Sequence, residues 1–221
     1  LAVREEHPTW GGRKIRRRLQ DLGQAKVPAA STITSILHRH GRIDPEASRQ
    51  RQPLTRFEHP APNELWQMDF KGQFRMTSGE YCFPLTVLDD HSRHAVVLQA
   101  CSNQQRETVQ EHLTRAFLRY GIPRAILSDN GSPWAAPHVV GRHTRLTVWL
   151  MDLDIAVWHG RPRHPQTQGK DERFHRTLKQ EVLQGRDFAD LAETQSRFDP
   201  WRETYNQVRP PEAQDVGVRG S

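Results

Sequence analysis

The sequence has little cysteine and no long apolar run. Cys82 and Cys101 are too few for a disulfide framework, and no cysteine pair has zinc-site spacing. No segment has the length and apolarity of a membrane span, and no signal peptide is visible. We therefore expect a protein of the reducing cytoplasm that works without a membrane partner.

The charge balance is basic rather than neutral. Lys and Arg number 32 against 26 acids, which gives a net charge of +6 and a pI near 9.8. This excess suits a polyanionic partner, and nucleic acid is the leading candidate. A generic basic protein would show the same balance, so charge alone does not assign the function.

Residues 1–43 read as helical and strongly basic. Ile15, Leu19 and Leu22 recur with helical spacing, and a second helix is expected to start near Ser31. Two short basic helices are typical of a helix-turn-helix that binds DNA, although a helical hairpin that only packs on its neighbour has the same pattern. The candidate DNA-binding residues of this segment are Arg13, Lys14, Arg16, Arg17 and Arg18.

The pattern changes twice along the rest of the chain. Residues 44–63 carry four prolines without apolar periodicity, which indicates a linker. From residue 64 to residue 210, strands and helices alternate. We expect strands at 65–70, 81–88, 95–99, 125–127 and 155–158, and helices at 104–120, 146–153, 168–183 and 187–205. This order predicts an α/β fold with a mixed five-stranded sheet covered by helices on both faces, followed by a tail at 211–221.

Two aspartates stand at strand positions. Asp69 lies within an apolar strand and faces away from its neighbours Met68 and Phe70. Burying such a carboxylate is costly without a partner or a metal, although a hydrogen-bonded structural aspartate would also satisfy the pattern. Asp129 ends another strand, where ligands collect in open α/β sheets, but it also precedes Asn130 and Gly131, which is ordinary turn chemistry.

A third acid, Glu172, stands on a helix with a basic face. The apolar stripe of this helix consists of Phe174, Leu178 and Val182. A step of about 100° per residue places Glu172, Arg176 and Lys179 on the opposite side. One face could thus hold a metal ligand and phosphate contacts, although a solvated face with a Glu–Arg pair has the same spacing. Asp171, which leans toward the stripe, and Glu181, more than two turns away, are rival acids.

Several motifs together resemble one family. WQMDFKG, LTVLDDHSRHAV, GIPRAILSDNGSPW, HGRPRHPQTQGKDERFHRTLKQE and YNQVRPPEA are similar to the motifs of the integrase-core, or DDE, family of insertion-sequence transposases, relatives of retroviral integrases. The resemblance implies a ribonuclease H-like fold in which Asp69, Asp129 and Glu172 bind two Mg²⁺ or Mn²⁺ ions and catalyse the reaction. It also implies that Arg176 and Lys179 contact transposon-end DNA.

The same resemblance implies a biological setting. Residues 1–43 resemble the later part of the family's DNA-binding region, so we expect an upstream portion. The expected function is metal-dependent cleavage at transposon ends and strand transfer into target DNA, by a homo-oligomer in the bacterial cytoplasm at the nucleoid, without a small-molecule substrate. A catalytically silent DNA-binding remnant and a plain nuclease of the same fold remain alternatives. The role of residues 136–145 stays open.

Overall fold

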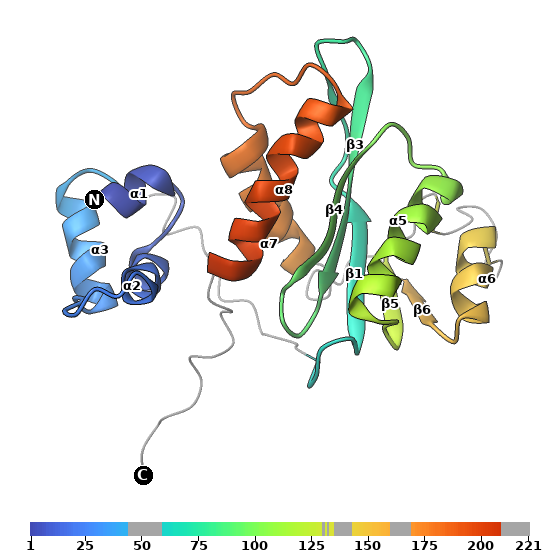
Figure 1. Cartoon of the computed structure of the whole chain (residues 1–221), viewed down its shortest axis with the longest axis horizontal. Coiled ribbons are helices and arrows are strands. Elements are labelled where there is room, and N and C mark those ends of the chain that lie inside the picture. The colour runs from blue at the N-terminus through green and yellow to red at the C-terminus, as the bar shows by residue number, and fades with distance from the viewer. Residues whose placement is uncertain (44–58, 130, 132, 135–142, 160–168, 209–221) are drawn as a thin grey trace.

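The computed structural model describes residues 1–43, 59–129, 131, 133–134, 143–159 and 169–208 (Figure 1). Most of the expected linker, most of residues 136–145 and the whole expected tail at 211–221 lie outside these residues. Over the described part, no helix is long and apolar enough to cross a membrane.

Three short helices form a unit with its own small core. They are α1 (Ala2–Glu6), α2 (Gly12–Asp21) and α3 (Ala30–Arg39). The buried residues of this unit are Trp10, Ile15, Ile33 and Leu37. The two expected helices correspond to α2 and α3, except that Leu22 is 52% exposed rather than buried. The reason is that α2 ends at Asp21, and Gly23 turns the chain with a φ of 73°.

Six strands form one mixed sheet. Their bounds are Leu65–Phe70 for β1, Phe74–Arg75 for β2, Tyr81–Asp89 for β3, Ala95–Cys101 for β4, Ala125–Ser128 for β5 and Ala156–His159 for β6. β3 pairs antiparallel with β4 and with β1, while β1 pairs parallel with β5, and β5 with β6. The strands on one side of β1 are therefore antiparallel to their neighbours, and the strands on its other side are parallel.

The expected count of five strands was too low because β2 is an additional short strand. After β1 ends at Phe70, Gly72 adopts a φ of 92°, which side chains disfavour, and the chain bends there. Phe74 and Arg75 then pair with Cys82 and Tyr81 at the start of β3. A two-residue strand has too few positions to show an alternating pattern in the sequence.

Helices cover both faces of the sheet. On one face lie α5 (Arg106–Tyr120) and α6 (Arg145–Asp152), and on the other lie α7 (Gly169–Leu178), a π-helical turn η1 (Lys179–Leu183) and α8 (Leu191–Val208) (Figure 1). Each face has its own apolar core. The helix expected at 168–183 therefore changes geometry after Leu178, and the last helix starts and ends later than expected.

Candidate active site

The pairing of β1 with β5 brings the two aspartates together. Leu65 pairs with Ala125 and Gln67 with Leu127 in parallel register, so the same register continued places Asp69 beside Asp129. Neighbouring strands lie about 4.8 Å apart, and residues two apart along a strand share a face. Two carboxylates from positions 60 residues apart thus meet at the end of β5 because of strand register alone.

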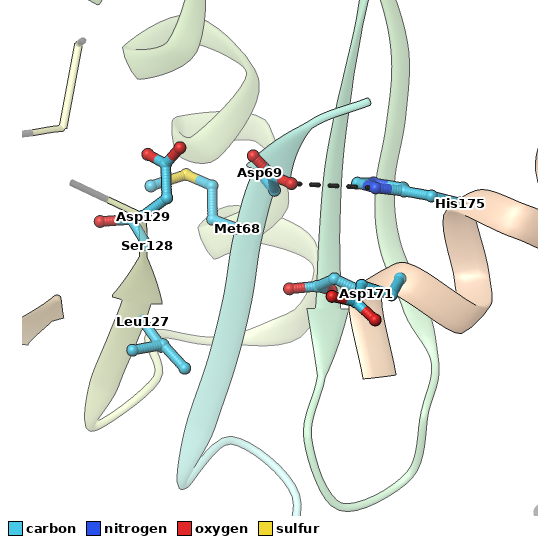
Figure 2. A pocket seen from close by; sticks show the side chains of 8 residues that line it. Met68, Asp69, Leu127, Ser128, Asp129, Asp171 and His175 are labelled. Carbon is cyan, nitrogen blue, oxygen red and sulfur yellow. Dashed lines mark ion pairs between the residues drawn. The ribbon is translucent and has the colours of Figure 1, made fainter. Parts of the chain in front are cut away.

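One pocket collects all three acids expected from the sequence. Figure 2 shows the pocket between the ends of β1 and β5 and the first turns of α7. The lining residues are Met68, Asp69, Leu127, Ser128, Asp129, Asp171, Glu172 and His175. The structure therefore gathers Asp69, Asp129 and Glu172, and it adds Asp171 and His175 to them.

The surroundings of Asp69 disfavour its charged form. Its pKa is raised from 3.8 to about 7, first because burial disfavours the charged form and second because Asp129 is a like charge nearby. The side chain still keeps 33% of its surface exposed, so solvent screens part of this effect. A cation between the two carboxylates would offset both effects by stabilising the charged form, which makes the pair chemically suited to a divalent metal.

Asp129 begins a tight turn beside the pocket. The amide of Gly131 donates a hydrogen bond of 2.9 Å to Oδ1 of Asp129. A Cβ at Gly131 would stand 3.2 Å from both carboxylate oxygens, so only glycine fits there without pressing on Asp129. The turn interpretation and the site interpretation of this motif are therefore compatible, because the turn holds the carboxylate at the pocket.

The acids of α7 and η1 differ in their surroundings. Asp171 is buried and Glu172 is exposed, although both line the pocket. Glu181 has a different role, because its Oε2 accepts a hydrogen bond of 2.8 Å from the indole of Trp201 on α8 and its Oε1 accepts one from the hydroxyl of Thr9. Glu181 therefore links η1 to α8 and to the N-terminal helices, while Asp171 remains a rival of Glu172.

The acidic pair at the end of β3, Asp89 and Asp90, is structural. Asp89 accepts a hydrogen bond of 2.8 Å from the amide of Asn63, and Asp90 accepts one of 2.6 Å from Nε2 of Gln67. Both side chains are buried and neither lines the pocket. These two acids fasten the chain that precedes β1 to the β3–β4 hairpin.

His175 is a pocket residue that the sequence analysis did not identify. Its Nδ1 lies 3.8 Å from Oδ2 of Asp69, and its Nε2 lies 2.8 Å from the hydroxyl of Thr86 on β3 (Figure 2). Its pKa is lowered from 6.5 to about 4, chiefly by burial and then by the charge of Lys71. The spacing of four residues from Asp171 was the available signal, whereas Thr86 becomes recognisable only through its register opposite Asp69.

The residues expected to bind metal and DNA are not all brought close together in the structure. Over the residues that the structure describes, no three His, Cys, Asp or Glu side chains stand close enough together to hold one ion. Arg176 and Lys179 are exposed, as expected for the face that carries Glu172. The basic residues of α2 belong to the separate N-terminal unit. Of these, Arg13, Arg16 and Arg17 are exposed, and Lys14 and Arg18 are partly buried.

Comparisons with known proteins bear on the family and the fold of this chain. Two family models, each described as an integrase core domain, match residues 59–165 and 153–215. The fold is also similar to a chain in the cryo-EM structure of the simian T-cell lymphotropic virus intasome in complex with PP2A regulatory subunit B56 gamma. The TM-score is 0.53 and the identity 18%, and the match covers 87% of this chain and 73% of that one.

Relatives among curated proteins include proteins of bacterial insertion elements. An uncharacterized 39.2 kDa protein of insertion element IS476 from Xanthomonas euvesicatoria is 28% identical over 67% of this chain and 41% of its own length. An uncharacterized 31.7 kDa protein of IS407 from Burkholderia multivorans is 28% identical over 69% of this chain and 52% of its own length. This chain thus spans about half the length of these relatives. The motifs, the ribonuclease H-like sheet and the family matches together show that residues 59–215 belong to the integrase core domain family.

Proposed function

We propose that this protein is a DNA transposase that cuts at transposon ends and joins them to target DNA. The observation that carries the proposal is the meeting of Asp69, Asp129 and Glu172 in one pocket of an integrase core domain. The relatives in insertion elements support a mobile-DNA context. The basic net charge of +6 suits a nucleic-acid substrate.

The residues of the pocket fit divalent cations of the Mg²⁺ or Mn²⁺ type. All the acids offer oxygen atoms, which hard cations prefer, and the raised pKa of Asp69 marks a place where added positive charge is favourable. Asp69 and Asp129 would be ligands together with Glu172, whose exposed side chain is free to complete the set. Two such ions, when bound, supply Lewis acidity at the attacking and the leaving oxygen.

The protein's own side chains would then bind and orient the DNA. Arg176 and Lys179 lie about one and two turns beyond Glu172 on the exposed side of the helix, where they would hold phosphates beside the acids. Correct placement matters, because a displacement of about 1 Å can cost on the order of a hundredfold in rate. The α2 cations, on a separate unit, would add affinity without acting on the scissile phosphate.

The decisive experiment uses the DNA that flanks the coding region. A duplex carrying the terminal repeats, incubated with this chain, Mg²⁺ and a plasmid target, should yield nicked ends and ends joined to the plasmid. Asp69→Asn, Asp129→Asn and Glu172→Gln should each abolish both products while DNA binding persists. Asp152→Asn, an exposed acid at the end of α6, is the matched control and should remain active.

The outcomes separate the proposal from its alternatives. Nicked ends without joined products would indicate a nuclease. Binding without either product at any divalent metal would indicate a silent remnant. Activity retained in any one of the three acid variants would remove that residue from the site, and activity that survives EDTA would contradict the use of metal.

The proposed DNA contacts are tested by comparing affinity with rate. Arg176→Ala and Lys179→Ala should reduce end cleavage more than they reduce overall affinity. Arg115→Ala, an exposed cation on α5, serves as control and should change neither. Neutralising Arg13 and Arg16 should weaken binding broadly and lower the salt slope by about one unit per lost phosphate contact. Equal, small losses of binding and cleavage at Arg176 and Lys179 would show that they only solvate the helix.

A further inference from the structure

The hydroxyl of Thr86 contacts both the Asp69 carbonyl and His175, which bears on which nitrogen of His175 carries the proton. Thr86 is fully buried, and its Oγ1 lies 3.0 Å from the carbonyl oxygen of Asp69 and 2.8 Å from Nε2 of His175. A carbonyl oxygen can only accept, so the hydrogen bond to Asp69 uses the single hydroxyl proton. With that proton on the Asp69 side, the contact with His175 calls for a donor on the imidazole, and the tautomer protonated at Nε2 fits both contacts.

The other ring nitrogen, Nδ1, therefore carries a lone pair, and this lone pair faces the pocket. Nδ1 of His175 lies 3.8 Å from Oδ2 of Asp69, which is too long for a hydrogen bond. Figure 2 shows the ring and the carboxylate directed at each other from α7 and β1. A hydrogen-bond donor placed between two acceptors that face each other at this distance would stabilise both of them.

We propose that His175 positions a water molecule in the active site, one that donates its two hydrogens to Nδ1 of His175 and to Oδ2 of Asp69. This inference rests on the proposed function and adds a residue to it. Acceptors 3.8 Å apart can each lie about 2.8 Å from one water oxygen, where they subtend roughly 85°. That angle is close enough to the water geometry for both hydrogen bonds to form.

The orientation of this water suits it for a role in the reaction. Because both hydrogens are engaged, its oxygen lone pairs point away from His175 and Asp69 and are available to an electrophile. A water that attacks a phosphodiester, or one that completes the shell of a cation, needs this orientation. Thr86 has a positioning role of its own, since it fixes the ring proton on the nitrogen that faces away from the water.

The first test measures the tautomer without any reaction. Long-range ¹H–¹⁵N spectra of the full chain, labelled at its 12 histidines, are recorded in EDTA at pH 7, and the spectrum of His175→Asn identifies the signals of His175. The expected result is a neutral ring protonated at Nε2. Thr86→Val should convert it to a mixture of tautomers, and Thr86→Ser should not. A ring protonated at Nδ1, or at both nitrogens, would overturn the proposal.

The second test separates water binding from simple packing. His175→Leu has similar bulk but no acceptor, so kcat for end cleavage should fall about 10- to 100-fold while KM for the DNA stays constant. His175→Asn, whose amide can accept near the position of Nδ1, should lose several-fold less. Equal losses in the two variants, or no loss in His175→Leu, would refute the water-binding role.

The two tests also separate this inference from the proposed function. If the wild-type protein shows no cleavage, the proposed function fails, and the tautomer spectrum still decides whether His175 presents a lone pair to Asp69. If His175→Leu does not fold, the comparison of Thr86→Val with Thr86→Ser in the spectrum and in cleavage decides instead. A Thr86→Val protein that cleaves as well as Thr86→Ser would count against the proposal.

Discussion

Replacing Asp69 by Asn should stabilise the metal-free protein above neutral pH. The folded-state pKa of about 7 exceeds the ordinary 3.8, so Asp69 destabilises the fold progressively as pH rises from about 4 to about 7 and fully above that. A shift of about three pKa units sets an upper bound of roughly 4 kcal/mol. Because 33% of the side chain is exposed, screening reduces the expected effect to about 1–2 kcal/mol.

Thermal unfolding in EDTA at several pH values measures this effect. Asp69→Asn should match the wild type near pH 4 and melt about 2–8 °C higher at pH 8. Added Mg²⁺ should raise the melting temperature of the wild type more than that of the variant, since it relieves the same repulsion. Asp152→Asn controls for loss of one surface charge. A variant that melts below the wild type at pH 8 in EDTA would refute the reasoning.

Three further changes test how the site and its supports are held. Gly131→Ala should press on the Asp129 carboxylate and reduce end cleavage at least several-fold with little change in melting temperature, as paired activity and melting assays would show. Gly12→Ala would bring a methyl group within 2.3 Å of the α3 backbone, so hydrogen exchange should report loosening of the N-terminal helices by about 1–3 kcal/mol while the core stays protected. Glu181→Ala should lower the free energy of unfolding by about 1–3 kcal/mol, measured in urea, because the partly buried indole of Trp201 loses its acceptor.

The fold was largely predictable because its elements have regular patterns. Strands β1, β3 and β4 and helix α5 lie within a few residues of their expected positions, since their apolar periodicity is long. The π-helical turn after Leu178 was not predictable, because the apolar stripe continues to Val182, which is buried in either geometry. The start of α8 was missed because Phe188, apolar and buried, precedes the helix rather than belonging to it.

The candidate site was predictable in its acids but not in its supports. Asp69 and Asp129 stand out because a charge within or just after an apolar strand is unusual. Thr86 carries no such signal, because a threonine in a strand is ordinary and only the pairing of β1 with β3 places it opposite Asp69. Side-chain hydrogen bonds between elements distant in sequence have no local pattern, which is why the contact of Thr86 with His175 required a structure.

The position of His175 on α7 explains both its chemistry and its omission. Counting about 100° per residue, Asp171 and His175 fall between the buried row of Phe174 and Leu178 and the exposed row that includes Glu172. A polar residue at this border does not fit the apolar pattern of the core, and it does not belong to the exposed face of the helix either. His175 nevertheless lies at the rim of the sheet beside Asp69, near the end of β1, and the neighbouring residues of its helix pack into the core. One helix thus delivers a buried carboxylate, an exposed carboxylate and an imidazole to the same pocket, and the apolar row fixes all three in register with the sheet.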